Sequence, residues 1–278
     1  MIIFSNAKIN LTLKVNSKTK NNLHEIQSLF CLINLKDKIK LIKIKGKRDK
    51  IIFNGPFAKY VNKSNNSIKN LLKLLRNLKV ISHYFSINIT KNIPVFGGLG
   101  GGTGNAASIL KYILKKKISR KILDQAEKAI GTDLRLFFYK IGYLNNLKQI
   151  VGLKKNQNFF FLLVHPKIKC STKEIFSKVR RYSKKKKLKK NEINTNQKFL
   201  KYLLQSKNDL QSIVEKKYPK IKGLLSDIRN VKGCYFSRMT GSGSVCYGLF
   251  KDQIYAKKGL NKLKTKYPNF WFSFAKTV

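Results

Sequence analysis

Six glycines stand within the eight positions of "GGLGGGTG", residues 97–104. The segment follows a strand-like run and precedes a helix-like one, although glycine weakens both kinds of element. Such density indicates a backbone that another group approaches closely. At a helix start, unpaired amides and the helix dipole attract anions, and glycine lets oxygens reach the main chain. The pattern predicts a phosphate-binding loop rather than only a tight turn packed against a helix.

Other chemical motifs are missing from the sequence. The glycine segment contains no GxxxxGK[ST] pattern and does not fit a dinucleotide-binding unit. The four cysteines and three histidines are widely scattered, which argues against a disulfide framework and a zinc site. We interpret Cys31, Cys170, Cys234 and Cys246 as buried or incidental thiols, and we assign no metal-ligating side chain.

The chain is strongly basic, with 60 Lys and Arg against 12 Asp and Glu and a net charge of +48. Such a field favours phosphorylated substrates. The lysines are spread along the whole chain without a nucleic-acid-binding motif, so we interpret the charge as compositional drift and expect no nucleic-acid partner. Only "KVRRYSKKKKLKK", residues 178–190, is dense enough to form a patch, and we interpret it as a solvated, mobile loop.

Hydrophobic periodicity predicts the elements that must position the glycine segment. In the first half, we expect strands at 7–15, 28–44, 51–55 and 84–94, and helices at 65–78, 105–116 and 119–130. In the second half, we expect a strand at 158–166, a helix starting at Ser171 and a mostly helical segment at 191–230. A strand–glycine turn–strand unit at 233–250, a helix and a terminal strand complete the chain.

Strands and helices are mixed without the strict alternation of a parallel sheet, which predicts an α+β fold. The polar stretch 145–157 predicts a boundary between domains 1–150 and 151–278. No apolar run reaches the roughly 18 residues of a membrane-spanning helix. The N-terminus lacks the pattern of a signal peptide. We therefore expect a cytoplasmic protein without a membrane partner, and the oligomeric state stays open.

Four segments resemble motifs of the GHMP kinases. "PVFGGLGGGTGNAA" (94–107) resembles their ATP-binding motif. Three others resemble further motifs of one branch of this family: "AKINLTLKV" (7–15), "LHEIQSLFCLINLKDKI" (23–39) and "MTGSGSVCYGLF" (239–250). They occur in the family's order and span nearly the whole chain. The resemblance implies an N-terminal domain like ribosomal protein S5 domain 2, a C-terminal ferredoxin-like domain, and an ATP-dependent kinase that uses Mg²⁺.

Phosphoryl transfer to an alcohol needs an aligned hydroxyl, removal of its proton and matching of the developing charge. The resemblance implies that Asp133, in "IGTDLRLFF", is the base or hydroxyl-orienting carboxylate and that Lys8 is its partner. It also implies that Asn66 contacts the nucleotide base, although helix capping alone would explain this asparagine. The residues expected along the ATP phosphates are Pro94, Gly97, Gly98, Leu99, Gly100, Gly101, Gly102, Thr103 and Gly104.

The same branch implies the small-molecule acceptor, 4-diphosphocytidyl-2-C-methyl-D-erythritol, phosphorylated on its 2-hydroxyl in non-mevalonate isoprenoid biosynthesis. The main chain of His24 and the ring of Phe176 are expected to contact the cytosine, although a phenylalanine in the hydrophobic core would explain Phe176 equally well. The glycine turn 241–243 is expected to bring the acceptor side to the ATP loop. The residues expected at the acceptor are Asn10, His24 (through its main chain), Thr172, Phe176, Gly241, Ser242 and Gly243.

Four features depart from the family's pattern. Leu23 stands in place of a tyrosine that stacks on cytidine, Thr103-Gly104 replaces two serines, and Arg135 replaces a proline. The stretch 140–157 is shorter than usual and lacks the family's A-x-GxGE-like segment. These departures leave two alternatives open. The alternatives to the kinase for 4-diphosphocytidyl-2-C-methyl-D-erythritol are a GHMP-type kinase for a different small alcohol and a diverged kinase fold that binds RNA through its basic surface.

Overall fold

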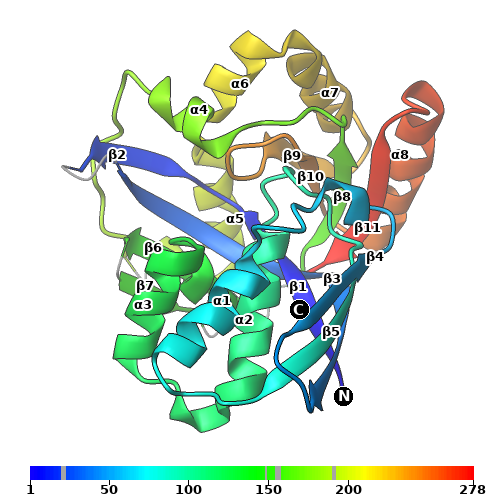
Figure 1. The fold of residues 1–278 in the computed structure, drawn as a ribbon. Coiled ribbons are helices and arrows are strands. Elements are labelled where there is room, and N and C mark those ends of the chain that lie inside the picture. Colours follow the sequence, from blue (N-terminus) through cyan, green and yellow to red (C-terminus); the bar gives the residue numbers. More distant parts are fainter. Residues whose placement is uncertain (20–22, 148, 154–157, 190–191) are drawn as a thin grey trace. The chain divides into compact units, whose positions relative to one another are not determined.

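The computed structural model describes residues 1–19, 23–147, 149–153, 158–189 and 192–278 (Figure 1). Its strands are β1 (Ile2–Asn10), β2 (Lys14–Lys18), β3 (His24–Ile44), β4 (Lys50–Asn54), β5 (Tyr84–Thr90), β6 (Ile141–Asn146), β7 (Gln149–Gly152), β8 (Phe160–His165), β9 (Cys234–Met239), β10 (Cys246–Phe250) and β11 (Trp271–Lys276). Its α-helices are α1 (Ser67–Asn77), α2 (Gly101–Leu114), α3 (Arg120–Ile130), α4 (Thr172–Ser177), α5 (Asn196–Gln205), α6 (Gln211–Lys217), α7 (Pro219–Arg229) and α8 (Gln253–Lys266). The short 3₁₀ helices are η1 (Ala58–Tyr60), η2 (Lys115–Lys117) and η3 (Leu134–Phe138). This mixture confirms the predicted α+β class.

The chain divides into two compact units, and the glycine segment is split between them. The first unit consists of Met1–Lys8, Leu35–Val95 and Gly100–Tyr139. The second consists of Ile9–Asn34, Phe96–Leu99 and Lys140–Val278. The expected boundary stretch 145–157 includes residues outside the described part of the chain, so the limits 1–150 and 151–278 stay a prediction.

The first unit contains helices and a sheet with both parallel and antiparallel strand pairs (Figure 1). The second half of β3 pairs antiparallel with β5, and β5 pairs in parallel with β4. Phe85, Ile87 and Ile89 alternate along β5 and are buried, as expected of a strand with one covered face. α1 contacts both α2 and α3. Its buried residues have helical spacing: Ile68, Leu71, Leu72 and Leu75.

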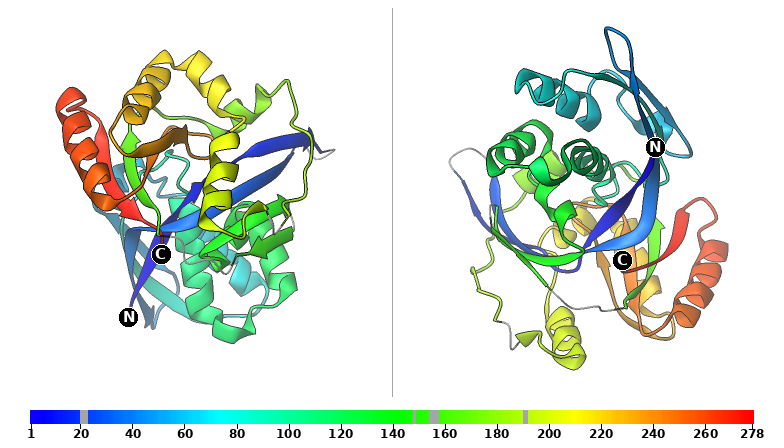
Figure 2. Two further views of the ribbon diagram at one scale, coloured as in Figure 1. Left: turned by 180° about the vertical axis from the view of Figure 1, so that it is seen from behind. Right: turned by 90° about the horizontal axis from the view of Figure 1, so that it is seen from below.

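The second unit contains a four-stranded antiparallel sheet in the order β11-β8-β10-β9. With α7 before β9 and α8 before β11, the element order is the ferredoxin-like βαββαβ. Gly248 of β10 lies opposite Leu162 of β8, so both point to one face of the sheet. Gly248 lies against Ile228 of α7, and Leu162 lies against Gly259 of α8. Both helices therefore cover this same face (Figure 2).

The strand predicted over 7–15 is interrupted after Asn10, which corrects that prediction. The amides of Leu11 and Thr12 both donate to the carbonyl of Leu29, at 2.7 and 3.1 Å. The Leu29 amide in turn donates to the Thr12 hydroxyl at 2.9 Å. Because two successive residues share one partner, the ladder breaks, and the chain resumes pairing only as β2.

The elements on either side of the glycine segment also differ from the predicted bounds. β5 ends at Thr90 rather than at 94, because the next amides, of Asn92 and Ile93, donate to the carboxylate of Asp37. Helix α2 begins at Gly101 rather than at 105. Part of the glycine run therefore forms the first turn of a helix.

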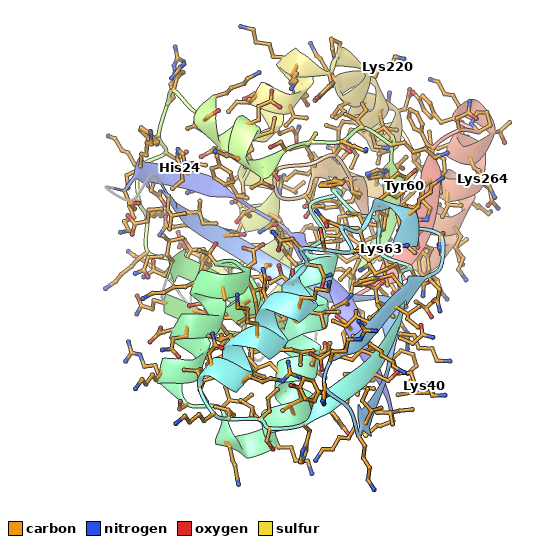
Figure 3. All side chains as sticks on the ribbon, viewed as in Figure 1. His24, Lys40, Tyr60, Lys63, Lys220 and Lys264 are labelled. Carbon is orange, nitrogen blue, oxygen red and sulfur yellow. The ribbon has the colours of Figure 1, made fainter. Side chains whose placement is uncertain are left out.

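Basic side chains project from many elements (Figure 3). Lys40 of β3, Lys63 before α1, Lys220 of α7 and Lys264 of α8 are all exposed. The positive charge is therefore distributed over the chain's surface elements. The four cysteines are free thiols, of which only Cys234 is partly exposed. Among the described residues, none of the helices has the length and apolar character needed to span a bilayer.

Candidate active site

Lys8 and Asp133 form an ion pair within the first unit. The Lys8 Nζ atom lies 3.1 Å from Asp133 Oδ2. The side chain of Lys8, near the end of β1, is only 4% exposed, whereas that of Asp133 is 35% exposed. The pair thus combines a buried cation with a carboxylate that solvent or a ligand can reach.

A turn between α3 and η3 places Asp133. α3 is C-capped by Gly131, whose φ of 140° other residues rarely adopt, and the Leu134 amide donates to the Gly131 carbonyl at 3.1 Å. Asp133 occupies the N-cap position of η3 without a side-chain capping bond. Its carboxylate is therefore not used by the helix and pairs with Lys8.

Arg135 attaches η3 to α3. Its Nη2 atom lies 2.5 Å from Asp124 Oδ1, and its Nε atom lies 2.8 Å from Glu127 Oε2. Burial raises the pKa of Glu127, and the charge of Arg135 opposes that rise. Where the family's pattern has a proline, these two ion pairs anchor the segment that follows Asp133.

Helix α2 begins against the stem of Lys8. Gly100 is its N-cap with a φ of 68°, and the Gly104 amide donates to the Gly100 carbonyl at 2.8 Å. The amides of residues 101–103 have no acceptor within the helix, and its first turn contains no acidic side chain. A Cβ at Gly100 would lie 3.3 Å from Cγ of Lys8. The anion-attracting end of α2 therefore adjoins the ion pair.

The glycines of the segment meet different neighbours, so close approach to phosphate is only one reason for their density. Cβ atoms at Gly100 and Gly104 would both lie 2.8 Å from the ring of Phe137. A Cβ at Gly101 would lie 3.0 Å from the side chain of Ile93. At Gly102, which is exposed, it would meet only the Ser67 hydroxyl at 3.4 Å. Gly102 is therefore the position in the first turn with the most open space.

A second ion pair fixes the chain where it enters the glycine segment. The Lys91 ammonium donates to the Asp37 carboxylate, and their side chains are 3% and 0% exposed. The Asp37 carboxylate also accepts the amides of Asn92 and Ile93, at 2.7 and 2.9 Å. Pro94, the first residue predicted at the ATP, follows directly and is buried.

In the second unit, residues 96–98 lie against the turn 240–245. The Val245 amide donates to the Gly97 carbonyl at 3.2 Å. A Cβ at Gly98 would lie only 2.3 Å from the Thr240 carbonyl oxygen, so this contact requires glycine. The Gly243 amide donates to the Thr240 carbonyl at 3.0 Å, which closes the turn. The turn therefore contacts residues 96–98 within this unit, and its role in bringing the acceptor to the ATP stays a prediction.

The residues predicted at the acceptor form two groups in the second unit. Asn10 donates its amide to the Thr240 hydroxyl at 3.0 Å and its side-chain nitrogen to Ser28 at 2.8 Å. A Cβ at Gly241 would lie 3.4 Å from Asn10 Oδ1. The Thr172 and Ser242 hydroxyls are 2.9 Å apart. The first group therefore joins β1, α4 and the glycine turn.

The second group is aromatic. The rings of His24 and Phe176 have centroids 5.1 Å apart, and the ring of Tyr182 lies 6.4 Å from that of His24. Thr172 and Phe176 are four residues apart on α4 and so lie on one helix face. Phe176 is half-buried rather than part of the fully buried core.

Asn66 caps helix α1. Its Oδ1 atom accepts the amides of Ile68 and Lys69, at 3.2 and 3.1 Å, and its side-chain nitrogen donates to the Asn62 carbonyl at 3.2 Å. This is the capping role that the sequence allowed, and contact with a nucleotide base stays a prediction.

Two family models match the chain. The model "GHMP kinases N terminal domain" matches residues 66–133, and the model "GHMP kinases C terminal" matches residues 185–269. A protein of Pelagibacter ubique named 4-diphosphocytidyl-2-C-methyl-D-erythritol kinase is 36% identical over 99% of this chain and 98% of its own. The chain belongs to the 4-diphosphocytidyl-2-C-methyl-D-erythritol kinase family of GHMP kinases. It is an ATP-dependent kinase with a small-molecule substrate, as its motifs indicate.

Relatives and solved structures agree with this family. A protein of Buchnera aphidicola with the same name is 33% identical over 91% of this chain and 86% of its own. A crystal structure of 4-(cytidine 5'-diphospho)-2C-methyl-D-erythritol kinase has a TM-score of 0.75 at 20% identity, covering 99% of both chains. A homoserine kinase from Cytophaga hutchinsonii has a TM-score of 0.68 at 16% identity, covering 100% of this chain and 94% of its own. The solved structures confirm the predicted GHMP kinase fold.

Three side chains that contact predicted site residues were not themselves predicted. Phe137 fills the space left by Gly100, the N-cap of α2, and Gly104 in its first turn, and this spacing of four residues was visible in the sequence. Asn208 donates to the carbonyls of Met239 and Gly241, both at 2.8 Å, and nothing in its sequence context indicated this. Tyr182 lies in the basic run 178–190, between Arg181 and Ser183, and the charge of that run gave no indication of an aromatic contact.

Proposed function

We propose that this kinase transfers the γ-phosphoryl group of ATP to the 2-hydroxyl of 4-diphosphocytidyl-2-C-methyl-D-erythritol, a reaction of isoprenoid biosynthesis. One observation carries the chemical part: the Lys8–Asp133 ion pair adjoins the glycine start of α2 within one unit. Phosphoryl transfer depends mainly on positioning and on electrostatic stabilisation, which such a site can supply. The names of the two relatives, both 4-diphosphocytidyl-2-C-methyl-D-erythritol kinase, support this acceptor.

The start of α2 fits a triphosphate, because it offers amides without intrahelical acceptors and carries no acidic side chain. We assign the phosphates to residues 100–104 and the adjoining Pro94, Gly97, Gly98 and Leu99. Mg²⁺ would neutralise phosphate charge when bound. It commonly keeps several waters and few protein ligands. The described residues contain no cluster of three or more His, Cys, Asp or Glu, and such a cluster is not required for this kind of site.

Asp133 is the proposed proton acceptor. Its partly exposed carboxylate would orient the acceptor hydroxyl and take its proton as the oxygen attacks phosphorus. Lys8, 3.1 Å from this carboxylate, would hold it in place and add positive charge near the transferred group. The 4% exposure of Lys8 keeps water away from this cation, which strengthens its field.

The acceptor groups of the second unit would hold the rest of the substrate. We assign Asn10, Thr172, Gly241, Ser242 and Gly243 to its polar part. We assign His24 and Phe176, whose rings are 5.1 Å apart, to its nucleobase. We further propose a cytoplasmic location, and we expect neither a nucleic acid nor a membrane as partner.

A panel of acceptors with coupled detection of ADP tests this function. ADP release is expected with the cytidine-bearing alcohol and not with galactose or homoserine. ADP release with another small alcohol alone would support the kinase reaction but contradict the proposed acceptor. Turnover that is absent with every alcohol, together with salt-sensitive RNA binding, would instead support the basic-surface alternative.

A further inference from the structure

Tyr182 belongs to the aromatic group of the second unit but is the most exposed ring in it. Tyr182 is 46% exposed, whereas His24 and Phe176 have intermediate exposure. The Tyr182 ring lies 6.4 Å from the His24 ring at an interplanar angle of 34°. A large ring that remains exposed beside other rings can stack on a planar ligand.

The backbone that follows Tyr182 is fixed to the strands of the same unit. The Ser183 amide donates to the Val15 carbonyl at 2.8 Å, and the Asn16 side chain donates to the Ser183 carbonyl at 3.0 Å. The Ser183 hydroxyl donates to Asp209 at 2.7 Å. Tyr182 is therefore next to a residue held by three hydrogen bonds.

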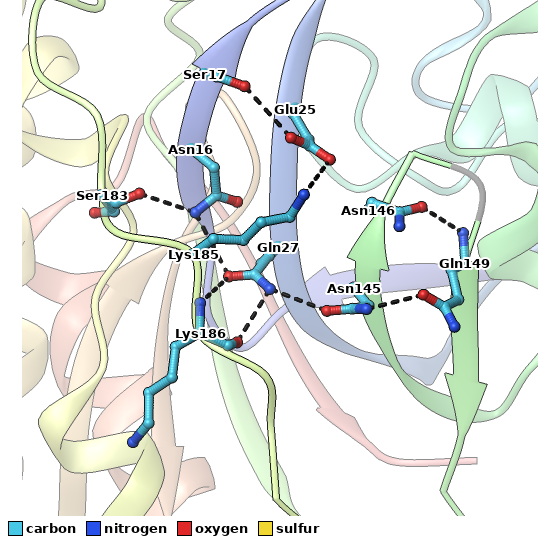
Figure 4. A network of polar contacts seen from close by, with 10 residues as sticks. All are labelled: Asn16, Ser17, Glu25, Gln27, Asn145, Asn146, Gln149, Ser183, Lys185 and Lys186. Carbon is cyan, nitrogen blue, oxygen red and sulfur yellow. Dashed lines mark hydrogen bonds and ion pairs between the residues drawn. The ribbon is translucent and has the colours of Figure 1, made fainter.

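Further along the segment, a second set of contacts repeats this attachment (Figure 4). The Lys186 amide donates to the Gln27 side chain at 3.1 Å, and Gln27 donates back to the Lys186 carbonyl at 3.0 Å. The Lys185 ammonium lies 2.7 Å from Glu25. The described part of the loop predicted over 178–190, residues 178–189, thus lacks regular structure, as expected, but it is anchored to β2 and β3. Little ordering of this segment is needed when a ligand binds.

The surroundings of Tyr182 favour an anionic aromatic ligand. Arg180 and Arg181, which precede it, are both exposed and carry positive charge. Burial and the charge of Lys18 lower the pKa of His24, so its ring is neutral at neutral pH and presents an uncharged face. Neutral rings next to exposed guanidinium groups suit a nucleobase linked to phosphates.

We propose that Tyr182 stacks on the nucleobase of a nucleoside-diphosphate acceptor and thereby determines its specificity, with His24 and Phe176 as neighbouring rings. This inference rests on the proposed function, because it assigns a new residue to the same acceptor. Tyr182 supplies an exposed aromatic face in this group, whereas Leu23, the residue before His24, is exposed but aliphatic.

Tyr182→Leu tests the proposal, with Tyr182→Phe as the conservative variant. Tyr84→Leu is the matched control, because Tyr84 is a partly exposed tyrosine at the start of β5 in the other unit. Base–aromatic stacking is strong enough that Tyr182→Leu should raise the KM for the cytidine-bearing acceptor about tenfold or more. The kcat and the KM for ATP should change less than about twofold, since stacking acts on acceptor binding. Tyr182→Phe and Tyr84→Leu should match the wild type.

Equilibrium binding of cytidine diphosphate, with the ATP site saturated by a non-hydrolysable analogue, separates this inference from the proposed function. A Kd raised about tenfold in Tyr182→Leu alone supports the proposal. Wild-type binding that Tyr182→Leu leaves unchanged overturns the role of Tyr182 and leaves the proposed function standing. Wild-type protein that neither binds cytidine diphosphate nor phosphorylates the acceptor overturns both.

Discussion

The first unit contains two lysine–aspartate pairs that differ in how the carboxylate is used. In the Asp37–Lys91 pair both side chains are almost completely buried, and Asp37 accepts hydrogen bonds from one ammonium and two backbone amides. In the Lys8–Asp133 pair the lysine is equally buried, but the carboxylate is 35% exposed and is not used to cap η3. The same two functional groups are therefore closed off in one place and accessible in the other.

This difference separates a structural pair from a candidate catalytic pair. A carboxylate whose lone pairs are occupied by protein donors fixes the chain but cannot accept a substrate proton. A carboxylate with an exposed edge can accept that proton and still keep its cation. Both pairs lie near the start of α2, since a Cβ at Gly101 would lie 3.3 Å from Lys91 Nζ and one at Gly100 would lie 3.3 Å from Lys8 Cγ.

Asp133→Asn is expected to have the largest effect on turnover. Loss of a proton acceptor or of a preorganised charge lowers kcat by about 10²–10⁴-fold. ATP affinity should change only a few-fold, because the amides of α2 are untouched. Lys8→Ala should lower kcat by at least about a hundredfold for the same electrostatic reason. Steady-state kinetics and ATP binding by calorimetry measure these effects.

Asp124→Asn is the matched control for Asp133→Asn. Asp124 is also a partly exposed carboxylate paired with a basic side chain, but its partner is Arg135, which keeps its second ion pair with Glu127 when Asp124 is replaced. Its replacement should change kcat by less than about threefold, since an exposed ion pair contributes only about 0–1 kcal/mol. Equal losses in the two variants would contradict the assignment of Asp133.

Asp37→Ala is expected to affect stability instead. Removing one partner of a buried ion pair costs about 3–5 kcal/mol, because the other charge stays buried. Here the amides of Asn92 and Ile93 also lose their acceptor. Urea denaturation should show this loss, whereas Asp133→Asn should cost less than about 1 kcal/mol, as expected for a partly exposed pair.

The double variant Asp37→Asn/Lys91→Met sharpens this test. Asparagine keeps an oxygen for the two amides, and methionine removes the buried charge that would otherwise be unpaired. The double variant should therefore be clearly more stable than Asp37→Ala. A double variant as unstable as Asp37→Ala would show that the charge of Lys91 is not the origin of the loss.

Gly102→Val and Gly101→Val separate crowding of ATP from crowding of the protein. A Cβ at Gly102 meets only a hydroxyl at 3.4 Å, whereas one at Gly101 meets Ile93 at 3.0 Å. Gly102→Val should weaken ATP binding about tenfold without loss of stability, since the added atoms occupy open space at the helix start. Gly101→Val should lower both ATP affinity and the urea midpoint. Unchanged ATP affinity in Gly102→Val would contradict the phosphate assignment.

The sequence predicted the helices and strands well because their apolar spacing is regular, as in α1 and β5. It also selected Lys8 and Asp133, though only through their motif positions, since lysines occur everywhere in this chain. Their 3.1 Å contact joins segments more than a hundred residues apart, and local periodicity contains no information on such a contact.

The bounds near the glycine segment could not be predicted because long-range contacts set them. The amides after β5 donate to Asp37, which lies more than fifty residues earlier, so the strand ends before 94. The structural role of several glycines likewise depends on Phe137, which reaches α2 from η3. Glycine density indicated close approach correctly, but it did not identify the approaching group.

His165, a buried base in the second unit, extends the comparison with the smallest expected effect. Lys8 and Lys91 each pair with a carboxylate. The described groups that shift the pKa of His165 include no carboxylate, and burial and the charge of Lys167 lower this pKa to about 4. Its unfolded pKa is about 6.5. The unfolded chain therefore binds more protons between these values, and stability must fall as the pH falls through this window.

From pH 7 to 5.5 the wild type should lose about 1 kcal/mol of unfolding free energy that His165→Phe does not lose. Urea denaturation at both pH values measures the difference, in which His24 cancels because both proteins contain it. Parallel losses in the two proteins would mean that His165 is charged in the folded state, and that burial without a carboxylate does not keep a base neutral here.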